Sequence, residues 1–142
     1  MAERKVIIVT GSSSGIGAEV ARLAARHDYN VVVNYASNAA GAEAVVGDCT
    51  ELGVEAIAVR ADVADDADCR RLAAAAMDAW GSIDVLVNNA GTTKFCAHAD
   101  LEGLDAEDFH HLYSVNTVGA FQMIRAVVPD MKKTGGAIVN VA

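Results

Sequence analysis

The stretch VIIVTGSSSGIG, residues 6–17, decides the fold. Its first four residues are apolar, as in a strand that is buried on both faces. The pattern that follows predicts a helix with Ile16, Val20, Leu23 and Ala24 on one face. Glycines between the two allow a tight turn and let backbone N–H groups approach a pyrophosphate, toward which the helix directs its positive end. The stretch therefore predicts a strand, a phosphate-binding turn and a helix.

The glycine spacing narrows the choice of ligand. Gly11, Gly15 and Gly17 form the pattern Gly-x-x-x-Gly-x-Gly, which is neither the Gly-x-Gly-x-x-Gly dinucleotide fingerprint nor a P-loop, since no lysine follows the last glycine. A glycine-rich turn without a ligand is the alternative, but the position between an apolar strand and an amphipathic helix favours phosphate binding. The expected cofactor-binding residues of this turn are Gly11, Ser12, Ser13, Ser14, Gly15, Ile16 and Gly17.

The same unit of strand and helix repeats along the chain. Further apolar runs at residues 31–33, 56–59, 83–87 and 138–141 predict strands. Helices are predicted between them, one capped by Asp65 and running to Gly81, and a long one that opens near Asp105 and is closed by Pro129 and Gly135. This alternation predicts an α/β fold, a doubly wound parallel sheet (Rossmann-like) of about five strands with helices on both faces.

Composition bounds the class of protein. The chain has 142 residues, of which 53% are hydrophobic, and it has one proline and no low-complexity linker, so residues 1–142 are expected to form one domain. The net charge is −8, and residues 48–108 alone carry 14 acidic and 4 basic side chains. This balance repels phosphate backbones and anionic lipid, so no nucleic-acid and no membrane partner is expected.

Cysteine and histidine usage favours neither disulfides nor a metal. Cys49, Cys69 and Cys96 are an odd number without paired spacing, which indicates a reducing compartment, the cytoplasm by default. The apolar run after Lys5 is too short for a secretion signal, and no run is long enough to span a bilayer. The clusters at residues 96–98 and 110–111 lack the four donors of a structural zinc site.

In a doubly wound sheet, ligands bind beyond the carboxyl ends of the strands. Asn34 ends the second strand, where an adenine-side ribose would sit. A carboxylate there would bind the 2′-OH of NAD and repel the 2′-phosphate of NADP, and none is present. No Lys or Arg is expected nearby either, and Ser14 stands where a basic residue would meet that phosphate. Because neutral Ser and Asn side chains bond a phosphate without excluding a hydroxyl, NADP is favoured and NAD stays open.

Two further strand ends carry candidate residues. Asp62-Val63 offers a carboxylate for an exocyclic amine and an apolar neighbour for a base, although Asp62 alone reads equally well as a solvated residue before a helix. Asn88-Asn89-Ala90-Gly91 offers two amides suited to locking neighbouring strands, with Gly91 admitting a cofactor, and a plain strand-ending turn is the alternative.

Asn116 is the least expected residue of the long helix. Its register with Phe109, Leu112, Tyr113, Ala120 and Met123 places it on the predicted buried stripe. A buried amide must be hydrogen-bonded to avoid a desolvation penalty. Either it bends the helix and holds a water, or it is a satisfied core asparagine.

These motifs, in this order, resemble the short-chain dehydrogenase/reductase family over essentially the whole chain. The resemblance implies that Gly11 to Gly17 bind the cofactor diphosphate, that Asp62 and Val63 bind the adenine, and that Asn89, Ala90 and Gly91 lie along the nicotinamide ribose. Asn116 then matches the family's catalytic asparagine, which holds a water in a proton relay. The resemblance also implies an NAD(P)-dependent oxidoreductase with a small carbonyl or alcohol substrate and a homo-oligomeric parent.

The chain departs from the family in its acid–base residues. The family uses a Ser at the end of the fifth strand and a Tyr-x-x-x-Lys, but Tyr29, Tyr35 and Tyr113 are not followed by lysine at that spacing. The chain stops at Ala142, one position short of where the serine aligns. We therefore expect the dinucleotide-binding half of a longer oxidoreductase, truncated after the fifth strand, missing the C-terminal part of the fold and inactive alone. The alternative is a non-catalytic nucleotide-binding module that senses or scaffolds, and the codons after Ala142 would discriminate the two.

Overall fold

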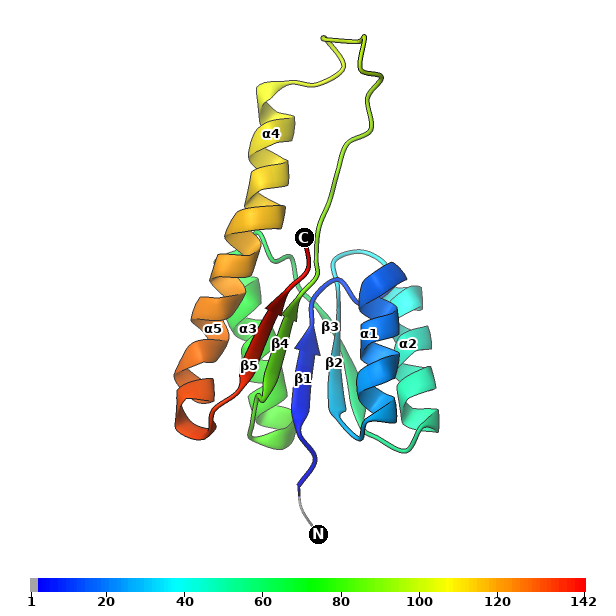
Figure 1. The fold of residues 1–142 in the computed structure, drawn as a ribbon, viewed down its shortest axis with the longest axis vertical. Helices are drawn as coiled ribbons and strands as arrows, with labels where there is room; N and C mark the ends of the chain where they lie inside the picture. Colours follow the sequence, from blue (N-terminus) through cyan, green and yellow to red (C-terminus); the bar gives the residue numbers. More distant parts are fainter. Residues whose placement is uncertain (1–2) are drawn as a thin grey trace.

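The computed structural model describes residues 3–142, so Met1 and Ala2 of the predicted domain lie outside the described residues. Five strands form one parallel sheet in the order β3-β2-β1-β4-β5 (Figure 1). Their bounds are β1 Val6–Val9, β2 Asn30–Tyr35, β3 Ala56–Arg60, β4 Val85–Asn88 and β5 Ala137–Asn140. Strand order reverses between β1 and β4, which makes the sheet doubly wound and confirms the predicted fold class.

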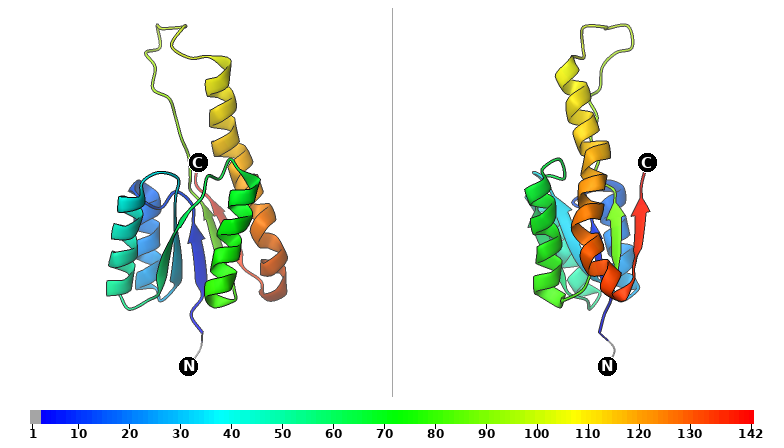
Figure 2. Two further views of the ribbon diagram at one scale, coloured as in Figure 1. Left: turned by 180° about the vertical axis from the view of Figure 1, so that it is seen from behind. Right: turned by 90° about the vertical axis from the view of Figure 1, so that its left-hand side faces the viewer.

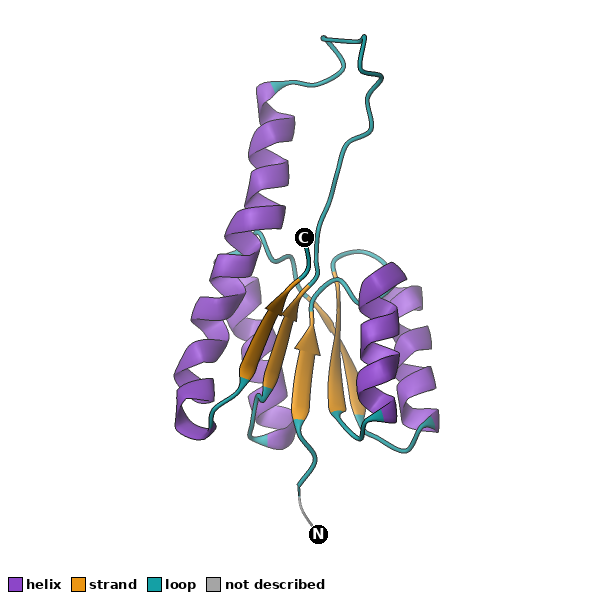
Figure 3. Cartoon of the chain, viewed as in Figure 1, coloured by secondary structure: helices purple, strands orange, loops and turns teal. Residues whose placement is uncertain are grey.

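Helices cover both faces of the sheet (Figure 2). One face carries α1 (Gly15–Arg26) and α2 (Ala39–Glu51), and the other carries α3 (Asp66–Trp80) and α5 (Gly119–Thr134). A further helix, α4 (Ala106–Tyr113), stands beyond the ends of the strands and joins α5 through the π-helical turn η1 (Ser114–Val118) (Figure 3). None of these helices is long and apolar enough to cross a membrane, a statement that covers residues 3–142.

The two sides of each strand supply two separate cores. On β1, Val6 and Ile8 pack with α3 and α5, whereas Ile7 and Val9 pack with α1 and α2. This follows from the period of two residues along a strand, which directs successive side chains to opposite faces. Both faces are therefore apolar, which is the reason that the strands read as continuous apolar runs.

The predicted apolar face of α1 is confirmed for Ala24, which is buried, and for Val20, which packs against the core, but it is wrong for Ile16 and Leu23. Ile16 and Leu23 are 64% and 51% exposed, and the residues that face the sheet are smaller ones. The buried residues of the helix are Gly17, Ala18, Ala21, Ala24 and Ala25. A stripe of small side chains lets the helix axis lie close to the strands, and this close packing outweighs the larger area that Ile16 and Leu23 would bury.

The long helical segment begins at Asp105 and ends at Gly135, the C-cap of α5, as predicted, but Pro129 does not close it. Asp105 does cap α4, where it forms a capping box with Asp108, but Pro129 lies inside α5, which continues to Thr134. A proline removes only one helical N–H, and burial of Val127 and Met131 on either side keeps the segment helical. Phe109 is 67% exposed rather than buried, because α4 has no sheet beneath it.

Candidate functional site

The turn between β1 and α1 is held from behind by polar side chains. The Thr10 hydroxyl oxygen accepts hydrogen bonds from the backbone N–H groups of Asn89 and Ala90, both at 3.0 Å. The Asn89 amide nitrogen donates to the carbonyls of Thr10 and Gly11, both at 3.1 Å. The Gly11 N–H donates to Asn34 Oδ1 at 2.9 Å. The ends of β2 and β4 thus fix the path of the turn.

The outer side of this turn carries backbone N–H groups that have no hydrogen-bond acceptor in the described part of the chain. Among residues 3–142, the backbone N–H groups from Ser13 to Gly17 have no hydrogen-bond acceptor. Ser14 precedes α1 with extended backbone and makes no capping bond, and the first turn of the helix holds no acidic residue. The positive end of α1 is therefore open, and such helix ends bind anions such as phosphate.

Two of the three glycines of the turn are required by close packing. A Cβ on Gly17 would lie 2.4 Å from the Gly11 carbonyl oxygen and 2.5 Å from Asn89 Nδ2. Gly11 has a φ of +61°, and a Cβ there would lie 2.8 Å from the Ala90 Cα. Gly15 has a φ of +57°, with open space where its Cβ would be. The glycine pattern therefore reflects a turn packed tightly against the end of β4.

A cleft of about 420 Å³ runs along the carboxyl ends of the strands. A second hollow, of about 690 Å³, continues from it toward the end of β5 and includes Asn89 and Asn116. The two share Ala90, Gly91 and Thr92. The predicted residues that line the first cleft are Gly11, Ser13, Ser14, Asn34, Asp62, Val63, Ala90 and Gly91. Most of the predicted site residues therefore converge on one edge of the sheet.

The remaining predicted residues of the turn lie away from this cleft. Gly15 and Ile16 line a hollow on the outer side of α1, and Gly17 is buried against Asn89. The Ser12 side chain is fully buried, donates to the Val9 carbonyl at 2.7 Å and accepts from the Asn34 N–H at 2.9 Å. Ser12 therefore shapes the turn from the inside.

Asn34 has a different task from the predicted one. Its side chain is buried, with Nδ2 donating to the carbonyls of Val59 and Ala61 at 3.2 and 3.1 Å while Oδ1 accepts from Gly11. This leaves neither amide hydrogen for a ligand. Asn34 braces the β1–α1 turn against the end of β3.

The expectation that no basic residue lies near the end of β2 is wrong. Arg60, the last residue of β3, pairs in register with Tyr35, and its Nε donates to the Ala36 carbonyl at 3.2 Å. Parallel pairing brings these positions together although they are far apart in the sequence. The signal available from the sequence was the position of Arg60 at the end of the neighbouring predicted strand.

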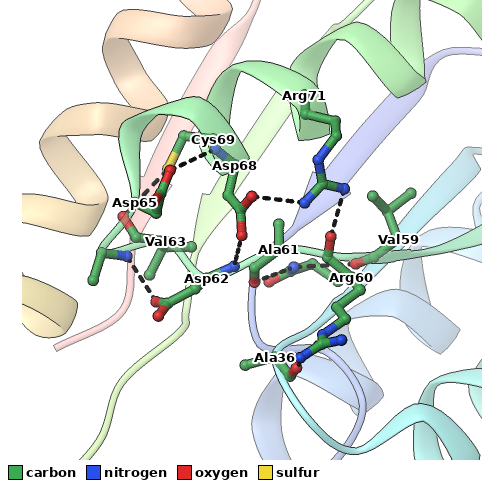
Figure 4. Close-up of polar contacts among 12 residues, drawn as sticks. Ala36, Val59, Arg60, Ala61, Asp62, Val63, Asp65, Asp68, Cys69 and Arg71 are labelled. Atoms are coloured by element: carbon green, nitrogen blue, oxygen red, sulfur yellow. Dashed lines mark hydrogen bonds and ion pairs between the residues drawn. The ribbon is translucent and has the colours of Figure 1, made fainter.

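The turn after β3 is fixed by a chain of polar contacts (Figure 4). The Asp62 N–H donates to the Asp68 carboxylate at 2.8 Å, and the Ala64 N–H donates to Asp62 Oδ1 at 2.9 Å. Asp68 also accepts from Arg71 at 2.7 Å. The hydrogen bond from the Asp62 N–H, followed by that from Arg71, lowers the pKa of Asp68 below its ordinary value. One Asp62 oxygen remains for the cleft.

Val63 is held in place by α5, a contact that sequence reasoning missed. The buried Gln122 amide donates to the Val63 carbonyl at 2.7 Å. Gly119 packs so closely that a Cβ would lie 2.6 Å from Val63 Cγ2. A polar residue within the apolar stripe of the long helix was the available signal for Gln122.

Asn116 is exposed, which corrects its predicted burial. It lies in η1 at the level where the helix passes the end of the sheet, so no strand covers it. Its Oδ1 accepts from the Thr92 N–H at 2.8 Å and its Nδ2 donates to the Thr92 carbonyl at 2.9 Å. The side chain therefore joins the helix to the segment that follows β4, and the helix is widened to a π turn at this point.

The amides at the end of β4 do lock neighbouring strands, as predicted. Asn88 Nδ2 donates to Asn140 Oδ1 at 3.0 Å, which joins β4 to β5, and Asn89 joins β4 to the β1–α1 turn.

The family model described as short chain dehydrogenase matches residues 5–142. The chain belongs to the short-chain dehydrogenase family. The chain is 42% identical over 140 residues to an uncharacterized oxidoreductase from Methylorubrum extorquens, a match that covers 99% of this chain and 55% of the relative. It is 39% identical over 137 residues to a 3-oxoacyl-[acyl-carrier-protein] reductase from Staphylococcus epidermidis, covering 96% of this chain and 55% of that one.

A solved alcohol dehydrogenase structure shares the fold. An alcohol dehydrogenase from Thermococcus sibiricus, complexed with 5-hydroxy-NADP, matches with a TM-score of 0.87 and 32% identity, covering 97% of this chain and 57% of that chain. The chain spans about half the length of the curated relatives it matches. The suspected family resemblance is thus confirmed, and the family is one of oxidoreductases that bind NAD(P).

Proposed function

We propose that these residues bind NADP(H), in preference to NAD(H), as the cofactor half of an oxidoreductase that moves a hydride between nicotinamide and a carbonyl or alcohol substrate. The observation that carries the proposal is the row of unpaired N–H groups from Ser13 to Gly17 at the open end of α1. A diphosphate satisfies such donors and also the helix dipole. The ketoacyl reductase and alcohol dehydrogenase relatives support the substrate class.

The remaining residues suit the two nucleosides. The open Asp62 oxygen accepts the exocyclic amine of adenine, and Val63, fixed by Gln122, contacts the base. Ala90 and Gly91 form a floor of small residues that lets the nicotinamide ribose approach the end of β4. The nicotinamide, when bound, supplies or accepts the hydride.

Asn116 acts in this proposal as a positioning residue for the nicotinamide end. Its two bonds to Thr92 hold the wall of the second hollow, beside Gly91. The proton donor of the reaction lies outside residues 1–142, because none of the three tyrosines precedes a lysine at the family spacing. A homo-oligomeric parent protein in the cytoplasm completes the proposal.

The proposal is tested by a substitution that disrupts the β1–α1 turn. Gly17→Val places a branched side chain against Gly11 and Asn89, and we expect it to weaken NADPH binding on the order of 100-fold, since several charge-assisted hydrogen bonds are lost together. The measurement is the enhancement of nicotinamide fluorescence on titration with NADPH, with circular dichroism as the check on folding.

Two variants complete this experiment. Gly15→Ala adds a methyl group in open space, so the core packing is intact, but the positive φ of +57° strains the backbone at the start of α1. We expect it to weaken NADPH binding less than Gly17→Val does. Gly47→Ala, in the exposed middle of α2 with nothing within 4 Å, is the matched control and should bind like wild type. Unchanged NADPH binding by Gly17→Val would refute the proposal. Binding without turnover of carbonyl substrates by the complete protein would instead favour a nucleotide sensor.

A further inference from the structure

We propose that Arg60 selects NADP(H) over NAD(H) by binding the 2′-phosphate of the adenine-side ribose. This inference rests on the nucleotide site proposed above. It identifies a basic residue for that site, where the sequence analysis expected none. It is carried by three observations, namely the position of Arg60, the state of its charge and the way in which its neighbours hold it.

The position places a guanidinium beside the turn after β2. Arg60 ends β3 directly opposite Tyr35, and its Nε–H donates to the Ala36 carbonyl at 3.2 Å. Figure 4 shows the side chain reaching from the end of β3 to Ala36. Ala36, Ser37 and Asn38 line the cleft next to Asp62. An adenine bonded to Asp62 would direct its ribose toward this turn, within reach of a long side chain.

Arg60 forms no ion pair within the described part of the chain, although its charge is among those that lower the pKa of the nearby Asp68. The acidic block at residues 48–108 contains only four basic side chains. Arg70, Arg71 and Lys94 form ion pairs with Asp66, Asp68 and Asp108 at 2.9, 2.7 and 2.7 Å. Arg60 forms none with any carboxylate between residues 3 and 142. A cation that stays unpaired within an acidic region is suited to an anion from outside.

The neighbours of Arg60 hold its backbone and leave the end of its side chain open. Arg71 donates to the Arg60 carbonyl at 2.7 Å, and Asp68 bridges Arg71 and the Asp62 N–H. Asp68 is thus bonded to Arg71 and to the Asp62 N–H, and it forms no ion pair with Arg60 although the two charges are close enough to interact. Because only Nε is bonded, to Ala36, both terminal nitrogens remain as donors among the described contacts.

The surroundings match a phosphate monoester. Ser13, Ser14 and Ser37 line the cleft together with Ala36, the residue to which Arg60 is bonded, and Asn38 caps α2 by accepting from the Gly41 N–H at 3.0 Å. A planar guanidinium binds phosphate oxygens through two parallel hydrogen bonds, whereas a ribose hydroxyl offers it no charge. Arg60 should therefore contribute to NADP(H) binding and very little to NAD(H) binding.

The experiment compares Arg60→Gln with Arg70→Gln in fluorescence titrations with NADPH and with NADH. Arg70 is a matched control because it is an exposed arginine of the same acidic region, on the outside of α3 and paired with Asp66. We expect Arg60→Gln to weaken NADPH binding on the order of 10-fold or more and to leave NADH binding within about twofold. Arg70→Gln should change neither. Added salt should reduce the wild-type preference for NADPH.

The experiment distinguishes failure of the inference on Arg60 from failure of the proposed function. An unchanged ratio of the NADH and NADPH dissociation constants in Arg60→Gln overturns the inference, and so does an equal loss for both nucleotides, which indicates stacking of the guanidinium on adenine. A wild-type protein that prefers NADH also overturns it. In the first two cases the proposed function stands, provided that Gly17→Val still weakens NADPH binding. In the third case the dinucleotide site and the oxidoreductase proposal stand on the same condition, but the proposed preference for NADP(H) falls with the inference. A wild-type protein that binds neither nucleotide overturns both.

Discussion

Two regions of this molecule differ in how their side chains are hydrogen-bonded and packed. One is the cleft edge, by which we mean the carboxyl ends of the strands around the first cleft. The other is the arm, which we define as residues 92–113. At the cleft edge, Thr10, Asn34 and Asn89 each bond to more than one backbone group. The arm rises past the ends of the strands and exposes apolar side chains, with Phe95 95% and Leu101 86% exposed. The shape of the edge is set by contacts within the chain, whereas that of the arm depends on few of them.

Few contacts hold the arm. Lys94 pairs with Asp108 at 2.7 Å, which ties the loop to α4, and Asn116 bonds Thr92 at the base. Surface ion pairs contribute at most about 1 kcal/mol. The cleft edge is therefore formed by the packed part of the fold, whereas the arm is the part that we expect to unfold locally at the lowest free-energy cost.

The largest expected difference between the two regions is in thiol reactivity. Burial raises the pKa of Cys69 to about 12, and burial also raises that of Cys49. At pH 8 a thiol with a pKa near 12 is ionised only about 10⁻⁴ of the time, so it reacts on the order of 1,000-fold more slowly than an ordinary exposed thiol. Cys96 lies in the arm and is half-buried, and so is more exposed than the other two.

The measurement is mass spectrometry after timed alkylation of the folded protein. We expect one rapid modification, at Cys96, and two more only after unfolding in denaturant. Cys96→Ser should remove the rapid event. Rapid modification of Cys69 in the folded state would show that the core opens as readily as the arm.

The next largest difference is in stability. Leu72 is fully buried between α3 and the sheet, and Leu101 is at the tip of the arm. Leu72→Ala should lower the free energy of unfolding by about 2–5 kcal/mol, because it leaves a cavity. Leu101→Ala should change it by less than about 0.5 kcal/mol, because an exposed side chain buries nothing. Urea unfolding of the pair measures both, and equal losses would contradict the distinction between the regions.

The smallest expected effect concerns Asp68, which is at the cleft edge. Its folded pKa lies below the unfolded value because the Asp62 N–H and Arg71 bond its charged form. Its contribution is therefore fully present above about pH 4 and is lost as pH falls through the lower folded pKa. Since the group is near the surface, the contribution is less than about 1 kcal/mol. Asp68→Asn should flatten the stability curve below pH 4, in urea unfolding at several pH values, and a curve parallel to wild type would contradict this.

The sequence predicted what is encoded locally. The apolar strands, the capping of α3 by Asp65 and the end of that helix at Gly81 all follow from short-range patterns. The glycine turn was predicted for the same reason, since its strand, turn and helix are contiguous in the chain.

The errors of prediction arise from contacts between distant segments. Arg60 was missed because only the pairing of β3 with β2 places it beside Ala36. Ile16 and Leu23 of α1 were wrongly expected to face the sheet, because residue size as well as spacing decides how closely a helix approaches the strands. Asn116 was expected to be buried because a helical pattern does not show where the helix leaves the sheet.

The bracing of the β1–α1 turn has a consequence for the thermodynamics of association. Since Asn34, Asn89 and Thr10 already restrict the backbone there, little conformational entropy is lost when a dinucleotide arrives, and more of the interaction free energy is retained as affinity. The site is thus preorganised at its diphosphate end, and only the surrounding side chains need to adjust to different dinucleotides.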